Sequence, residues 1–272
     1  MVSTARTTRD RVTSATIDQG TDRVGCGVTE TGAPVLFGMT ESLAATRDAW
    51  HRLAEHVLSA ARYAVTGRIG LVPAAGGFAT PAFGPDGCML AVDLDEFVVT
   101  RDGRQWRTRI ATVAQVADFA GITPGAPQQV YRPATPLEPD APLRIDRTAA
   151  QFLADWYQLG SQALAGFAAA VPDDEPTSAQ LWPEHFDLGI TAARVNYGVS
   201  PGDEHVVEPY LYVGPFDGPP TADEFWNAPF GAVLRHDEVS SIRAATDFFH
   251  IGRARAHIAH KGSSSGHRRP AR

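Results

Sequence analysis

Apolar side chains recur at helical spacing directly after residue 40. Between residues 41 and 66 they follow one another every three or four positions, which predicts a long amphipathic helix. Thr40 precedes this helix as an N-terminal cap, and Gly67 ends it. His51 and His56 fall on different faces of the helix, and we expect both to lie on the protein surface.

Short β-prone runs replace the helical pattern after Gly67. Turn residues separate the runs, and two of the breaks, at residues 84–87 and 101–104, are typical of hairpins. The runs cover residues 68–73, 77–83, 88–94, 96–100 and 105–110. This arrangement predicts an antiparallel meander, closed by a short helix from Thr112 to Phe119.

A proline-rich segment follows at residues 122–145. Its prolines are too dense for a helix or an inner strand, so we expect a linker that runs over the surface. A second helical pattern extends from Asp146, as its cap, to Val171. Further strands come next, and a last helix is expected at residues 238–258 with Asp237 as its cap.

The order helix, meander, helix, meander, helix predicts an α+β protein. We expect two similar halves, each a long helix packed on an antiparallel β-meander, plus a C-terminal helix. The halves do not align residue by residue, so a duplication stays an open question. The expected divisions are a partly disordered N-terminal segment, the first half, the linker, the second half and a disordered basic tail, at residues 1–39, 40–121, 122–145, 146–260 and 261–272.

The composition is that of an ordinary globular protein. A chain of 272 residues, with 43% hydrophobic and 20% charged residues, can bury a core without disulfide or metal cross-links. Its formal charge of −7 is spread along the chain, and no basic stripe with interleaved aromatic residues indicates a nucleic-acid surface. No window approaches the ~18 apolar residues that span a membrane. Two cysteines at no metal-ligand spacing fit a soluble, cytoplasmic protein.

Candidate chemistry gathers in one stretch, residues 181–215. If its first part, up to Ile190, forms a single strand, alternate side chains share a face. His185 and Asp187 then point one way, while Leu188 and Ile190 point toward the core. In that position the carboxylate can orient the imidazole, as catalytic and metal sites require.

A second strand is expected to carry Glu208 and Tyr210 on one face. If both polar faces line one cleft, these residues converge with His185 and Asp187. His205, in the preceding turn, completes a set of imidazoles and carboxylates that suits Zn²⁺, Mn²⁺ or Fe²⁺. The candidate metal ligands are His185, His205 and Glu208, and the candidate catalytic groups are His185, Asp187 and Glu208.

The expected register of these strands argues against a shared site. A turn at residues 200–204 would pair Glu208 near Val195 and leave Asp187 beyond the matching end of the ladder. The same residues can therefore form an ordinary solvated sheet face, and both interpretations stay open.

A G-x-S-x-G pattern at residues 198–202 matches the nucleophile elbow of hydrolases. Its context does not fit, because Pro201 has no N–H for an oxyanion hole and a strand follows where the elbow needs a helix. We expect a turn here.

Arg194, Asn196 and Tyr197 are candidate ligand-binding residues, together with Tyr210. An arginine fork beside an amide can bind a carboxylate or a phosphate. Such groups more often satisfy loop carbonyls, and this alternative also stays open.

Five phrases stand out along the chain. They are GGFATPAFG at residues 76–84, LWPEHFDLGI at 181–190, NYGVSPGD at 196–203, EPYLYVGPF at 208–216 and FWNAPFGA at 225–232. By these phrases most of residues 40–255 resembles a family of uncharacterised actinobacterial proteins. The resemblance implies a bacterial cytoplasmic protein, but it implies no activity, cofactor or substrate.

These observations lead to one function hypothesis and two alternatives. We expect binding of a small polar molecule in a cleft lined by histidine, aspartate, glutamate and tyrosine side chains. One alternative is a metal-dependent, hydrolase-like enzyme that uses His185, Asp187 and Glu208. The other is a non-catalytic interaction or structural module, in which the same residues join the two halves by hydrogen bonds.

Overall fold

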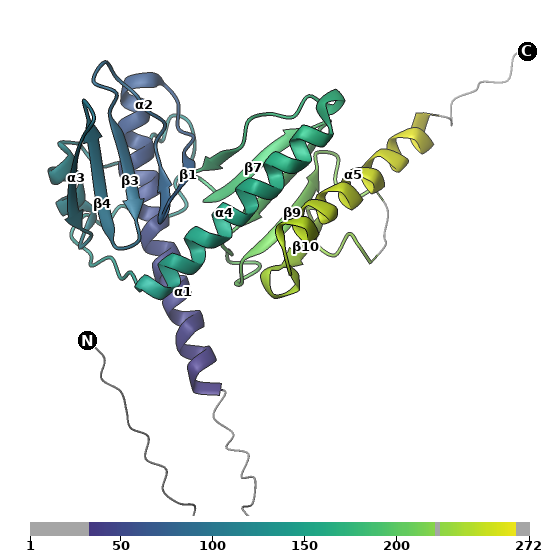
Figure 1. Ribbon diagram of the computed structural model, residues 1–272, viewed down its shortest axis with the longest axis horizontal. Coiled ribbons are helices and arrows are strands. Elements are labelled where there is room, and N and C mark those ends of the chain that lie inside the picture. Colours follow the sequence, from purple (N-terminus) through teal and green to yellow (C-terminus); the bar gives the residue numbers. More distant parts are fainter. Residues whose placement is uncertain (1–32, 221–223, 265–272) are drawn as a thin grey trace, which may run out of the picture.

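The computed structural model describes residues 33–220 and 224–264, with side chains placed for 41–220 and 224–256. Within these ranges the chain forms helices and two five-stranded antiparallel sheets (Figure 1), which confirms the predicted α+β class. The segments expected to be disordered, 1–39 and 261–272, lie largely outside the described residues. No helix in the described part is long and apolar enough to cross a membrane.

The first helix is longer than the range that its sequence pattern predicts. It runs through α1 (Ala33–Leu53), a π-helical turn η1 (Ala54–Ser59) and α2 (Ala60–Thr66). Gly67 ends it in the left-handed conformation with φ 68°, as predicted. The predicted start at Thr40 is wrong, because the backbone is already helical from Ala33.

The expectation that His51 and His56 lie on the surface is also wrong. His56 is 2% exposed, and the side chain of His51 is 15% exposed. Both are covered by segments far along the chain: His51 stacks on Phe186, and His56, inside the π-turn, hydrogen-bonds to the backbone of Ala126 and Thr135. Glu55 is fully buried in the same turn.

The proline-rich segment is fastened to this π-turn. Glu55 accepts hydrogen bonds from the backbone of Ala134 and Thr135 at 2.9 and 2.8 Å, and from the Thr135 hydroxyl at 2.5 Å. His56 Nδ1 accepts from the backbone of Ala126 at 3.1 Å, so its Nε2 donates to the Thr135 carbonyl at 3.0 Å. The buried acid and imidazole thus satisfy a segment that has no helix or strand of its own.

The first sheet is the predicted meander. Its strands are β1 (Val72–Ala74), β2 (Gly77–Ala79), β3 (Met89–Asp93), β4 (Glu96–Arg101) and β5 (Arg104–Arg109), paired in sequence order. Asp102 and Gly103, both at positive φ, make the tight turn between β4 and β5. The short helix α3 (Val113–Ala120) follows, with Thr112 as its cap and Gly121 as its stop.

The second half repeats this order. Helix α4 (Arg147–Ala170) is capped by Asp146, as predicted, and a short 3₁₀ turn η2 (Pro172–Asp174) follows it. The sheet contains β6 (Gln180–Trp182), β7 (Asp187–Ala192), β8 (Val195–Ser200), β9 (Tyr210–Pro215) and β10 (Ala232–Arg235). The last helix, α5 (Ile242–Ser264), begins later than predicted: Asp237 lies in a 3₁₀ turn η3 (His236–Glu238), and Ser241 caps the helix.

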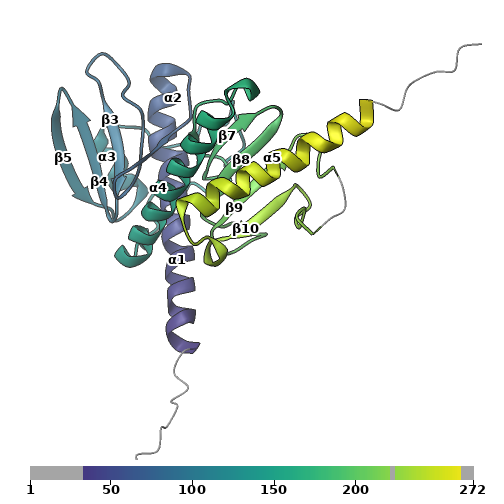
Figure 2. The same ribbon diagram turned by 45° about the vertical axis from the view of Figure 1, so that its right-hand side comes forward.

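Helices α4 and α5 lie side by side over one face of the second sheet (Figure 2). Each approaches closely at a glycine. A Cβ at Gly160 of α4 would lie 2.3 Å from a Val199 methyl group, and one at Gly252 of α5 would lie 2.7 Å from a Val213 methyl group. Because α4 and α5 cover this face, only the opposite face of the second sheet is available to line a cavity.

The two halves share one hydrophobic core. Leu71 and Leu181, at the neighbouring edges of the two sheets, exchange backbone hydrogen bonds of 2.8 and 2.9 Å. Phe186 from the second half packs edge-on against Phe78 and Tyr157 at 5.3 and 5.7 Å between ring centroids, and it stacks on His51 at 5.1 Å. Helix α1 is thereby held beside the second sheet.

Candidate functional site

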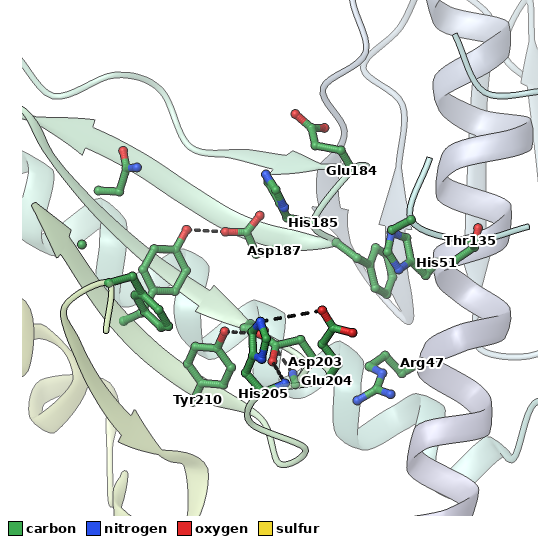
Figure 3. A pocket seen from close by; sticks show the side chains of 18 of the residues that line it. Arg47, His51, Thr135, Glu184, His185, Asp187, Asp203, Glu204, His205 and Tyr210 are labelled. Atoms are coloured by element: carbon green, nitrogen blue, oxygen red, sulfur yellow. Dashed lines mark hydrogen bonds and ion pairs between the residues drawn. The ribbon is translucent and has the colours of Figure 1, made fainter. Parts of the chain in front are cut away.

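A cavity of about 950 Å³ lies between α1 and the uncovered face of the second sheet (Figure 3). Its walls come from α1, the proline-rich segment, the β6–β7 turn, the β8–β9 loop and strand β9. Both halves of the chain therefore build it. The volume is in the range of sites for small molecules, about 300–1,000 Å³.

The stretch predicted as one strand up to Ile190 is a hairpin. Trp182 of β6 pairs with Asp187 of β7, and the residues between them form the turn. Phe186 takes positive φ there, and its carbonyl accepts a hydrogen bond from Tyr157 at 2.6 Å. This burial of Phe186 sends the chain back on itself, so Glu184 and His185 project from a turn at the cavity.

The expected register of the following strands is also wrong. Val195 pairs with Pro215 and not with the region of Glu208, which precedes β9. Leu188, the residue after Asp187, is opposite Val199, and Ser200 is opposite Tyr210. The β8–β9 loop is longer than the expected turn, and it shifts the ladder so that Asp187 and Tyr210 share one end of the sheet face.

Asp187 and Tyr212 form the centre of this face. The Tyr212 hydroxyl donates a short hydrogen bond to Asp187 Oδ2, while the buried Oδ1 of Asp187 has no hydrogen-bond partner. The Tyr212 ring lies over two glycines: a Cβ at Gly198 would be 2.3 Å from its Cζ, and one at Gly189 would be 2.9 Å from its hydroxyl. The glycines make room for the ring.

Burial governs the protonation of this pair. Removal from water raises the pKa of Asp187, and the hydrogen bond from Tyr212 opposes this shift without cancelling it. Burial, together with the nearby Asp187 carboxyl, raises the pKa of Tyr212 well above its usual value. Burial also raises the pKa of Glu184, whose Oε2 has no hydrogen-bond partner. A carboxyl of this kind can exchange a proton with a bound molecule.

The β8–β9 loop is organised by Asp203. This carboxylate accepts from the Tyr210 hydroxyl at 2.5 Å and from the backbone of His205 and Val206 at 2.7 and 2.8 Å. Burial acts to raise the pKa of Asp203, but these hydrogen bonds outweigh burial and lower it. Asp203 therefore stays ionised and keeps the loop folded against the cavity.

Helix α1 supplies the facing wall. His51 Nε2 lies 2.8 Å from the Pro183 carbonyl, and burial lowers the pKa of its imidazole, although the nearby Glu55 opposes this shift. Arg47 pairs with Asp48 at 3.0 Å and also reaches the Val207 carbonyl. These contacts fix the wall against the hairpin and the loop.

The structure brings together some of the residues expected from the sequence. Those that line the cavity are His185, Asp187, Asn196, His205 and Tyr210. No hydrogen bond joins His185 to Asp187 Oδ1, but His185 lies near enough to Asp187 to act against the rise in its pKa.

Three other candidates lie elsewhere. Glu208 pairs with Arg235 at 2.8 Å on the surface, and Arg194 pairs with Asp217 at 3.0 Å. Tyr197 is fully buried on the opposite face of the sheet, because side chains alternate along β8. These residues do not belong to the cavity wall.

The proposed metal ligands His185, His205 and Glu208 do not form a metal site. Among the described residues, no group of three or more histidine, cysteine, aspartate or glutamate side chains could hold a metal ion. The expectation of a Zn²⁺, Mn²⁺ or Fe²⁺ centre required Glu208 to face the cleft from a strand, but Glu208 precedes β9 and pairs with Arg235.

Four important residues escaped the sequence analysis: Tyr212, Glu184, Asp203 and His51. A signal for the first was present, since Gly189 and Gly198 interrupt two neighbouring strands, and a glycine inside a strand often marks the close approach of another group. His51 and Glu184 gave no comparable signal, because folding alone brings α1 to the hairpin.

Comparisons of the chain with protein-family models, with curated proteins and with solved structures found no match. The function must therefore be argued from the cavity and its chemistry.

Proposed function

We propose that the protein binds a small polar organic molecule in the cavity between α1 and the second sheet. The observation that supports this most directly is the Asp187 carboxyl, which has Tyr212 on one oxygen and no partner on the other. Buried polar atoms are almost always hydrogen-bonded. Asp187 lines the cavity, and its buried Oδ1 can accept a hydrogen bond from a ligand that displaces the side chains covering it.

The alternative of a structural module is weaker for these residues. Glu55 and His56 do fasten two parts of the chain together, and their hydrogen-bonding groups are satisfied in doing so. Asp187 and Glu184 keep an oxygen without a partner. Residues that serve only to join the halves would be expected to resemble the first pair.

A ligand screen with matched variants tests the proposal. Fragments are screened by ligand-observed NMR, and each binder is retested by thermal shift, since a ligand at a hundred times its Kd stabilises the folded state by about 2.7 kcal/mol. Binding is expected to weaken in Asp187→Asn and Tyr212→Phe and to be unchanged in Asp118→Asn, which alters an exposed acid on α3. If no fragment binds, or if both cavity variants bind as the parent does, the proposal fails.

A further inference from the structure

We infer that the molecule bound in this cavity carries a positive charge, and is an organic ammonium or amidinium compound. This inference rests on the proposed function and adds the chemical class of the ligand. It is carried by the charge and the aromatic surface of the cavity wall.

Acidic groups outnumber arginines in the wall. The acids are Asp48, Glu184, Asp187, Asp203 and Glu204, and the arginines are Arg47 and Arg52. Both arginines already have acidic partners: Arg47 pairs with Asp48, and Arg52 pairs with Glu138 at 2.9 Å, outside the wall. The wall also contains His51, His185 and His205, but neither of its arginines is left without an acidic partner to receive an anionic ligand.

Within the described residues, the other four acids of the wall pair with no arginine or lysine, although His185 lies near Glu184 and Asp187 and acts to lower the pKa of both. Asp203 is held by neutral donors, the Tyr210 hydroxyl and two backbone N–H groups. In the described part of the chain, the ion-pair partner of Glu204 is the exposed His205, at 3.7 Å. Asp187 and Glu184 each add a buried oxygen without a hydrogen-bond partner. Burial raises the pKa of both carboxyls, and a cation bound beside them would favour their ionised form.

Aromatic side chains complete the match. Tyr212 is tilted against Tyr210 at 6.3 Å and packs edge-on against Phe230 at 6.5 Å between ring centroids, and all three line the cavity. Carboxylates combined with aromatic faces are the surroundings in which proteins recognise organic cations. A phosphate or carboxylate ligand would instead meet the acids and the electron-rich ring faces.

Three probes of nearly equal shape test the charge directly. They are phenethylamine, 2-phenylethanol and 3-phenylpropanoate, which are cationic, neutral and anionic at neutral pH. Isothermal titration measures each against the full chain, and the fragment screen is sorted by charge in parallel. The cation is expected to bind most tightly, and its affinity to fall as salt screens the acids. Asp187→Asn and Glu184→Gln should each weaken it on the order of tenfold, while Asp118→Asn should not.

The outcomes separate this inference from the function on which it rests. If neutral or anionic compounds bind in an Asp187-dependent manner while matched cations do not, the cavity is a ligand site and the inferred charge is wrong. If no compound of any charge binds, the proposed function fails and the inference fails with it. A cation that binds equally well to Asp187→Asn and Glu184→Gln also overturns the inference.

Discussion

Gly198→Ala is the substitution that tests the geometry of the site most directly. The new Cβ would lie 2.3, 2.4 and 2.5 Å from Cζ, the hydroxyl oxygen and Cε1 of Tyr212. Contacts this short cannot persist, so the ring must leave its position over the sheet. Because its hydroxyl holds Asp187, the substitution removes that hydrogen bond without changing either partner.

The cost follows from three contributions. Overpacking costs about 1–3 kcal/mol, and loss of a hydrogen bond to a buried charged group costs about 1.5–3 kcal/mol. Alanine is favoured over glycine within a strand by roughly 0.5–1 kcal/mol. We therefore expect the free energy of unfolding to fall by roughly 2–5 kcal/mol, measured by urea denaturation followed by circular dichroism.

Two controls isolate the ring. Gly214→Ala changes a glycine on the same sheet face, where the nearest atom would be the Phe230 carbonyl oxygen at 3.6 Å, an ordinary contact. It should cost little. In a Tyr212→Ala background, Gly198→Ala should cost nothing further, because the clashing ring is gone. An equal cost of Gly198→Ala with and without the Tyr212 side chain would refute the reasoning, and so would a Gly214→Ala variant as unstable as Gly198→Ala.

Three further predictions concern single acids. Because the pKa of Asp187 is raised in the folded state, the stability that its neutral form contributes is present at low pH and lost as pH rises through the raised pKa. Asp187→Asn should therefore gain stability relative to the parent from about pH 4 upward; urea titrations at pH 5 and 8 that show the opposite trend contradict this. Glu55→Gln should lose about 1.5–3 kcal/mol and expose residues 122–145 to limited proteolysis, while the exposed Glu41→Gln should do neither. Glu208→Ala breaks a surface ion pair and should change stability by no more than ~1 kcal/mol and leave ligand binding intact; impaired binding would return Glu208 to the site.

Most helices and strands could be predicted from the sequence, because caps, turns and hydrophobic periodicity are local signals. Asp146 and Thr112 begin helices, and Gly67 and Gly121 end them, since capping depends only on neighbouring backbone groups. The strands of the first sheet also follow from their hairpin turns. The main error among the strands was the turn at residues 183–186, where Pro183 was a turn signal that the single-strand interpretation did not use.

The candidate site could be predicted only in part. Asp187 and Tyr210 were expected on one polar face, and the structure places both at the cavity. Their register could not be predicted, because it depends on the length and folding of the β8–β9 loop, which Asp203 organises. Glu208 and Tyr197 were misplaced for related reasons: the first precedes its strand, and the second faces the core.

The sequence by itself determined the α+β class, most of the helix and strand positions, and the stretch in which polar groups gather. These follow from periodicity and from turn and cap chemistry, which act over a few residues. The tertiary structure decided that His51 and Arg47 of α1 line the same cavity as Asp187, that Tyr212 lies over two glycines, and that the arginines of the wall are already paired. Each of these depends on contacts between segments far apart in the chain, where packing and burial, and not local propensity, set the position and the charge of a side chain.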